Sequence, residues 1–174
     1  MKKYELTTNT KMRFGRKLFQ IKALVSFGDV TAGDLGGYIE KEENLSHDGT
    51  AWVSGDARVY GDAWVYGDAW VYGDARVSGN ARVYGNAWVS GNALVYGDAD
   101  YICFKGFGSE NRNTTMFRTK NGDVYVRCGC FTGSLKKFTE KVKETHGNSK
   151  YAKEYLACVE VAKIHFEIGE ENDK

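Results

Sequence analysis

Long apolar segments are absent from the chain, which has no run of about 18 hydrophobic residues and no signal-peptide pattern. We therefore expect a cytoplasmic protein with no membrane partner. Charge of one sign is also lacking, because 24 basic residues balance 23 acidic ones and the net charge is +1. Such a weak field does not indicate direct binding of nucleic acid. The four cysteines are too sparse for a disulfide scaffold, which predicts reduced thiols.

What the chain has instead is a six-residue repeat. Nine consecutive hexads run from Gly49 to Ile102, as GTAWVS, GDARVY, GDAWVY, GDAWVY, GDARVS, GNARVY, GNAWVS, GNALVY and GDADYI. Glycine opens every hexad, alanine is third in all nine, and valine is fifth in eight. A regular period of this kind determines the architecture before local propensities do.

Each hexad reads as one very short strand followed by a corner. Alanine and valine are two positions apart, so both point to one face of a strand, while the residues beside valine point outward. Gly-Asp and Gly-Asn are turn dipeptides, because glycine tolerates a positive φ and the Asp or Asn side chain can bond nearby backbone. A helix is excluded, since a glycine in every hexad would cost it about 1 kcal/mol each time. A coil that turns after each hexad and pairs in parallel with its neighbours fits the pattern.

Tandem hexads with a small residue two positions before an aliphatic one resemble the left-handed parallel β-helix of hexapeptide-repeat proteins. The segment from Gly36 to Glu40, followed by Asn44-Leu45-Ser46 and Ala51-Trp52-Val53, also resembles bacterial and prophage proteins of this type, some of them labelled transferases or polymer-forming proteins. The resemblance implies three hexads, or about 18 residues, per triangular coil. The hexads would then form about three coils, with Ile39 and Leu45 starting an earlier, less regular one.

With this coil length, residues 18 positions apart lie on one face, and their outward side chains map the surface. The first face is expected to carry Trp52, Trp70, Trp88 and Tyr72, the second Arg58, Arg76 and Tyr60, and the third Trp64 and Arg82. Such an aromatic and basic surface indicates an interface, most simply with one or two further copies of the chain. The alternative is that the flat rings only stack along the ladder and stabilise it.

The two ends of the coil are expected to be capped, because an open end exposes unpaired strand groups. Residues 1–44 are assigned to an N-terminal β cap and residues 45–102 to the β-helix. Residues 103–174 read as an α+β domain, in which a hairpin turns at Asn121-Gly122 and Ser134 and Ser149 begin two helices. The predicted fold is therefore mainly β: a left-handed parallel β-helix with an N-terminal β cap and a C-terminal α+β domain.

The C-terminal domain contains one candidate anion site. The turn from Gly129 to Gly133 leads into a helix N-terminus at Ser134, where free N–H groups favour negative charge. The basic residues on or near the adjoining hairpin are Arg112, Arg118 and Arg127. Together with Gly133 and Ser134 they could grip a phosphate or an acidic partner. The alternative is an ordinary N-cap beside surface arginines.

Catalysis is not expected, although the resemblance leaves one enzymatic alternative. Many left-handed β-helix proteins are acyltransferases that use a histidine base and a coenzyme A groove between coils. Here His47 precedes the regular repeat, His146 and His165 follow it, and no loop interrupts the hexads to build an acceptor pocket. We therefore expect no catalytic residue and no cofactor.

A metal site is not expected either. The corner aspartates lack the glycine-rich nonapeptide of calcium-binding repeats. Cys128 and Cys130 are too close in sequence for a zinc knuckle, and buried thiols are the simpler interpretation. A four-thiolate site that includes Cys103 and Cys158 is the alternative.

These features predict a non-catalytic binding or scaffold protein that forms a dimer or trimer. The resemblance to phage proteins implies a more specific version, in which a phage- or prophage-encoded protein acts in the host cytoplasm. It would antagonise host defence by binding an effector protein or by sequestering a nucleotide signal. A hexapeptide-type acyltransferase and a purely structural oligomer are the alternatives, because the hexads are informative about fold and nearly silent about function.

Overall fold

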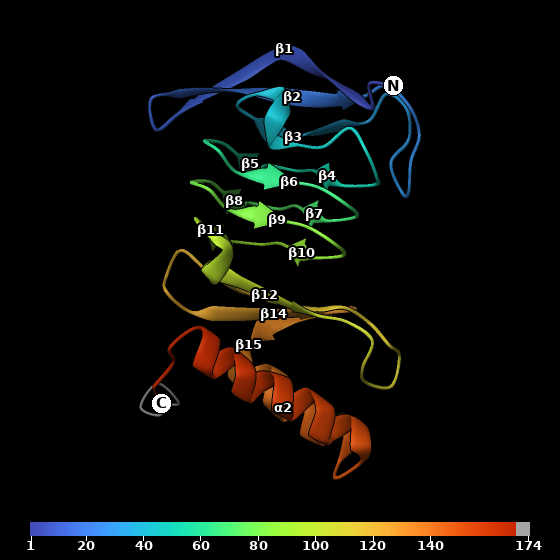
Figure 1. The fold of residues 1–174 in the computed structure, drawn as a ribbon, viewed down its shortest axis with the longest axis vertical. Coiled ribbons are helices and arrows are strands. Elements are labelled where there is room, and N and C mark those ends of the chain that lie inside the picture. The colour runs from blue at the N-terminus through green and yellow to red at the C-terminus, as the bar shows by residue number, and fades with distance from the viewer. Residues whose placement is uncertain (170–174) are drawn as a thin grey trace. The chain divides into compact units, whose positions relative to one another are not determined.

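The computed structural model describes residues 1–169, in two compact units that divide between Asp98 and Ala99. The first unit contains the N-terminal cap and the repeat, and the second contains an antiparallel sheet and two helices (Figure 1). The predicted cap and β-helix therefore form one unit.

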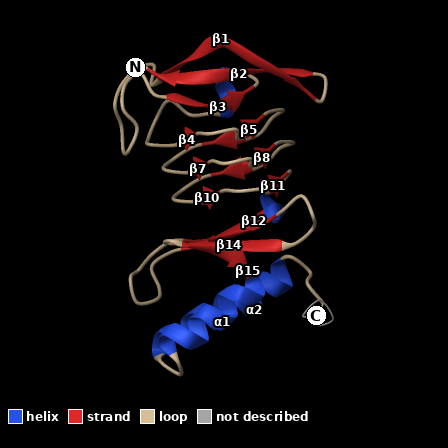
Figure 2. Cartoon of the chain, turned by 180° about the vertical axis from the view of Figure 1, so that it is seen from behind, coloured by secondary structure: helices blue, strands red, loops and turns tan. Residues whose placement is uncertain are grey.

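The hexads from Gly49 to Tyr96 form a solenoid of eight two-residue strands. These are β4 (Trp52–Val53), β5 (Arg58–Val59), β6 (Trp64–Val65), β7 (Trp70–Val71), β8 (Arg76–Val77), β9 (Arg82–Val83), β10 (Trp88–Val89) and β11 (Leu94–Val95). Each strand pairs in parallel with the strand that lies 18 residues away, as predicted. The result is a first face of β4, β7 and β10, a second of β5, β8 and β11, and a third of β6 and β9 (Figures 1 and 2).

The alanines and valines of the hexads fill the interior of the solenoid. From Ala51 to Val95, each of them is at most 1% exposed, which confirms the predicted core. The ninth hexad departs from the pattern, because Asp98–Asp100 forms the 3-10 helix η2 and Tyr101 begins the next strand. Tyrosine stands where the narrow core would need valine, so the coil ends there.

Three strands precede the solenoid. They are β1 (Tyr4–Arg13), β2 (Arg16–Ala23) and β3 (Leu35–Ile39), which pair antiparallel in that order. β3 then pairs in parallel with β5, so the cap continues the second face of the solenoid. Ile39 pairs with Val59 and Leu45 with Val65, a spacing of 20 rather than 18, which confirms the less regular earlier coil. All three strands lie within residues 1–44, which the sequence assigned to a β cap.

Side chains of the cap satisfy carbonyl groups of the first coil. Within the repeat, corner carbonyls accept from the preceding coil, as when the N–H of Asp62 donates to Gly79. The first coil has no regular predecessor. Asn44, in the 3-10 helix η1 (Glu42–Asn44), therefore donates its amide to the carbonyls of Gly61 and Ala63, at 3.1 and 2.8 Å. At another corner the Lys3 amine donates to Gly49 and Ala51, at 3.3 and 2.8 Å. Buried backbone groups are thus paired as folding requires.

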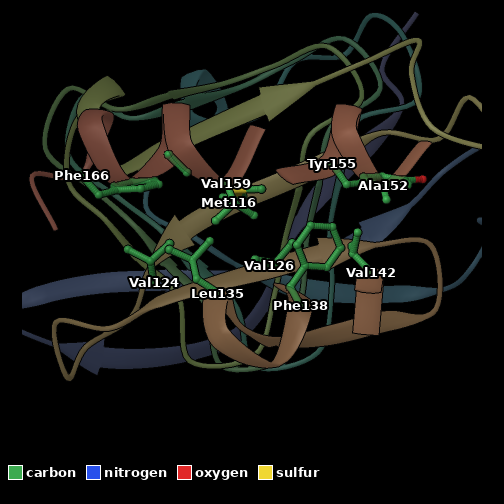
Figure 3. Packing of buried hydrophobic residues seen from close by; sticks show 11 residues of the cluster. Met116, Val124, Val126, Leu135, Phe138, Val142, Ala152, Tyr155, Val159 and Phe166 are labelled. Atoms are coloured by element: carbon green, nitrogen blue, oxygen red, sulfur yellow. The ribbon is translucent and has the colours of Figure 1, made fainter. Parts of the chain in front are cut away.

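The second unit is a four-stranded antiparallel sheet with two helices. Its elements are β12 (Tyr101–Phe104), β13 (Thr114–Arg118), β14 (Val124–Cys128), β15 (Phe131–Ser134), α1 (Leu135–His146) and α2 (Lys150–His165). Ser134 and Ser149 cap the helices as predicted, and β13 and β14 form the predicted hairpin. Sheet residues such as Met116 and Val126 meet Phe138 of α1 and Val159 of α2 in one core (Figure 3).

None of the helices within residues 1–169 is long and apolar enough to span a lipid bilayer.

Candidate binding surface

The predicted register places the outward residues of the solenoid in columns. Trp52, Trp70 and Trp88 are aligned on the first face, Arg58 and Arg76 on the second, and Trp64 and Arg82 on the third. The solvent exposure of each column depends on which of its side chains the N-terminal cap covers. The repeat sequence does not predict these contacts.

On the first face, the expectation that Trp52 belongs to an exposed aromatic surface is wrong. Its side chain is only 2% exposed, because Phe27 from the loop before β3 packs edge-on against it at 5.4 Å and Tyr4 of β1 at 6.3 Å. Trp70 is half-buried, and only Trp88, at 40%, is well exposed. The three tryptophans therefore do not form one open ladder.

Tyr72, the remaining expected residue of the first face, is half-buried as well.

On the second face, the tip of the β1–β2 hairpin reaches over the coils. Phe14 at this tip stacks on Tyr60, with ring centroids 5.9 Å apart, and the Arg76 guanidinium lies 5.3 Å from the Phe14 ring. Arg58 is half-buried beside them. This face is partly occupied by the chain's own cap.

The third face carries the most continuous group of exposed rings. Trp64 stacks on Tyr66 at 4.1 Å, and Tyr66 stacks on Tyr84 at 5.2 Å. Trp64 remains 41% and Tyr84 51% exposed, and the exposed Arg82 is the register partner of Trp64. We call Trp64, Tyr66 and Tyr84 the aromatic ridge. Tyr66 and Tyr84 were not among the expected binding residues, although their spacing of 18 in the sequence was a signal that they stack.

The candidate anion site of the second unit is not assembled. Arg118 is paired with Val124, on the helix-covered side of the sheet, where it donates to the Phe166 carbonyl at 2.6 Å. Arg127 points to the opposite side, where it donates to the Thr132 hydroxyl at 2.9 Å. Strand alternation separates the two guanidinium groups, so they cannot grip one phosphate.

The other members of that site do not complete it, although the Arg112 side chain lies against Gly129 of the turn. Arg112 lies 3.6 Å from Glu110. The expected turn up to Gly133 is wrong at its end, because Gly133 belongs to β15 and pairs with Val126. The Ser134 hydroxyl accepts from the Lys137 N–H at 3.4 Å, which is an ordinary N-cap.

The cysteines are free thiols on different sides of their sheet. Cys103 pairs with Thr115, and Cys128 pairs with Thr114, so the two sulfurs face opposite ways. Burial, with smaller contributions from the charges of Glu154 and Cys128, raises the pKa of the Cys158 thiol to about 11. Within residues 1–169, no three His, Cys, Asp or Glu side chains are grouped closely enough to hold a metal ion.

His47 is built into the N-terminal cap. Its ring stacks on Tyr4 at 4.3 Å, its Nδ1 accepts from the Lys3 N–H at 3.1 Å, and its Nε2 lies 3.8 Å from Glu42. His146 stacks on Tyr155 in the second unit.

Stacked hexads, three parallel faces and an Ala-Val interior define the chain as a β-solenoid repeat protein. The profile of the YdcK Beta solenoid repeat matches it at residues 51–67, 69–85 and 75–91, all within the solenoid. A comparison with curated proteins finds no match to the chain.

Proposed function

We propose that the protein is a non-catalytic binding module that engages a protein partner through the aromatic ridge. The observation that carries the proposal is the accessibility of this stack: two of its three rings are at least 41% exposed, whereas Trp52 on the first face is covered. The buried alanines and valines already provide the core, so the coil does not need these rings for its interior. Exposed aromatic groups of this kind are typical of interface centres.

The charges around the ridge are of both signs. Asp62, at the corner before Trp64, lies 3.2 Å from the Lys41 amine, and the carboxylate of Asp68, at the corner after Tyr66, accepts from the Thr50 hydroxyl at 2.8 Å. Arg82 is exposed beside Trp64. The ridge therefore favours a partner that supplies apolar or aromatic contact area at its centre, with charged pairs only at the rim.

The more specific version of this function concerns host defence. A phage-encoded antagonist that binds an effector protein is compatible with a protein-binding ridge, but its support is the sequence resemblance alone. Sequestration of a nucleotide signal has less support, because Arg118 and Arg127 do not converge on one site. A purely structural oligomer would use the same rings only between copies of the chain.

The acyltransferase alternative depends on a histidine that can act as a base. The stacking of His47 on Tyr4 and its hydrogen bond from the Lys3 N–H favour a structural role in the cap. Measured turnover of acetyl coenzyme A that is lost in His47→Ala, with the fold intact by circular dichroism, would support the enzyme and overturn the non-catalytic proposal.

Affinity capture with a matched pair of variants tests the ridge. The wild type, the double variant Trp64→Ala/Tyr84→Ala and the control Tyr151→Ala would be used as baits in lysates of phage-infected and uninfected cells. Tyr151 is as exposed as Trp64 but belongs to α2. We expect a defined protein to be retained by the wild type and the control and to be lost from the double variant. Equal retention by all three baits would exclude the ridge as the binding surface.

A further inference from the structure

Helix α2 has a second apolar stripe that its own unit does not cover. Its buried residues, Ala152, Tyr155, Val159 and Ala162, face α1 and the sheet. On the opposite side, Ala157, Val161 and Ile164 recur at helical spacing and are exposed, Ile164 to 80%. Ile164 is thus one of the most exposed large apolar side chains in the described part of the chain.

The charges along one flank of this stripe change sign from end to end. Lys153 lies near the start of α2 and is exposed, and Glu167 lies just beyond its end and is exposed as well. Glu160 lies between them, and the amine of Lys163 is 3.1 Å from its carboxylate. An antiparallel copy of the same helix would therefore present its acidic end to the basic end of the first.

We propose that the exposed stripe of α2 is a homodimer surface, on which α2 of a second copy packs antiparallel with the axis between Glu160 and Val161. This arrangement places the small Ala157 of one copy opposite the large Ile164 of the other at two symmetric positions. Each Ile164 side chain then fills the space left beside an alanine. It also places Lys153 opposite Glu167 of the second copy, because equivalent flanks meet in an antiparallel pair. The two Glu160 side chains approach each other near the axis, and Lys163 offsets their repulsion.

The same features argue against a membrane as the occupant of the stripe. A helix that lies on a lipid surface carries lysine and arginine along its polar flanks. Here the flank is mixed, with acidic residues at positions 160 and 167. The surface is also distinct from the aromatic ridge, so the dimer does not depend on the proposed function of the ridge.

The mass of the full chain in solution tests the surface. Sedimentation velocity or light scattering of the wild type at micromolar and higher concentrations should show a concentration-dependent shift to twice the monomer mass. Ile164→Glu should abolish the shift, because it buries a charge against Ala157 of the other copy. Leu35→Glu is the matched control, since Leu35 is 60% exposed but lies in β3, and it should dimerise as the wild type does. A wild type that remains monomeric, or an Ile164→Glu variant that still dimerises, would overturn the proposal.

Charge reversal tests the antiparallel direction. Lys153→Glu places two acidic groups together and should weaken the dimer several-fold at low salt, as should Glu167→Lys. The double variant Lys153→Glu/Glu167→Lys restores opposite charges and should recover most of the affinity. If each single variant dimerises as strongly as the double variant, the two residues do not face each other and the antiparallel arrangement is wrong.

Discussion

Asn44 closes one corner of the solenoid with a single side chain. Its amide donates to two carbonyls of the first coil, and its carbonyl oxygen accepts from the N–H groups of Glu40 and Lys41, at 3.2 and 3.0 Å. Asn44→Ala would remove the side-chain donor of the Gly61 and Ala63 carbonyls and the side-chain acceptor of the Lys41 N–H, whereas the Glu40 N–H would keep its bond to the Val59 carbonyl at 3.1 Å. We expect the free energy of unfolding to fall by about 2–3 kcal/mol in chemical denaturation.

Asn80 provides the control for this prediction, because it is an exposed asparagine at a corner of the repeat. Asn80→Ala should change the stability by no more than about 0.5 kcal/mol. Equal losses in the two variants would show that Asn44 has no special capping role.

Lys3 makes the stability of the cap depend on pH. Burial lowers the pKa of its amine from 10.5 to about 8, although the charges of Asp48 and Asp68 act in the opposite direction. Between these two pKa values the unfolded chain binds more protons than the folded chain, so stability rises with pH. Below about pH 8 both states are protonated, and the cost of burying the charge is constant.

The change Lys3→Met isolates this effect. The stability of the wild type relative to Lys3→Met should increase between about pH 8 and pH 10, measured by denaturant titration at each pH. A difference that stays constant across this interval, or that decreases, would contradict the lowered pKa of Lys3.

Two corner glycines with the same backbone conformation have different surroundings. Gly79 and Gly91 both have a positive φ, of 64° and 61°. A methyl group on Gly79 would overlap the carbonyl oxygen of Tyr96, whereas a methyl group on Gly91 would meet nothing within 4 Å. Gly91→Ala should therefore cost only the backbone strain, about 1–2 kcal/mol. Gly79→Ala should cost at least about 1 kcal/mol more, because it adds a steric clash.

Thermal unfolding of the two variants checks this difference. The midpoint of Gly79→Ala should lie clearly below that of Gly91→Ala. If the two midpoints coincide, the backbone conformation and not the packing of neighbouring coils determines the cost.

The elements that the sequence predicts well are those specified by local pattern. The hexads predict the coil, its register and its interior, because alanine and valine alternate with outward residues in every repeat. Ser134 and Ser149 likewise predict the two helix starts. β15 was missed because glycines at positions 129 and 133 suggested a turn, whereas Gly133 lies in a strand paired with Val126.

Accessibility could not be predicted from the repeat. Trp52 and Trp88 occupy equivalent positions in their hexads, yet one is 2% and the other 40% exposed. The difference arises from Phe27 and Tyr4, which are distant in sequence and belong to no repeat. The accessible part of the aromatic surface thus depends on long-range contacts of the cap, and these contacts restrict the candidate site, which was expected on all three faces, to the third.

At the scale of the whole molecule, the two proposed surfaces lie in different units. The aromatic ridge belongs to the solenoid, and the dimer stripe belongs to α2, so each can be removed without changing residues of the other. If both proposals hold, dimerisation provides two ridges per particle, and a partner with two or more sites binds more tightly by avidity.

Dissociation from a surface coated with the partner is therefore expected to distinguish the wild type, the monomeric variant Ile164→Glu and the ridge variant Trp64→Ala/Tyr84→Ala. On a surface densely coated with the captured partner, the wild type should dissociate slowly, and Ile164→Glu should dissociate faster. On a sparsely coated surface the two should dissociate at the same rate, because only one ridge can bind at a time. Trp64→Ala/Tyr84→Ala should not bind at either density, although its mass should still be that of a dimer. Equal dissociation of the wild type and Ile164→Glu at high density would show that the two ridges of a dimer do not bind together. Loss of dimerisation in the ridge variant would show that the solenoid, and not α2 alone, holds the copies together.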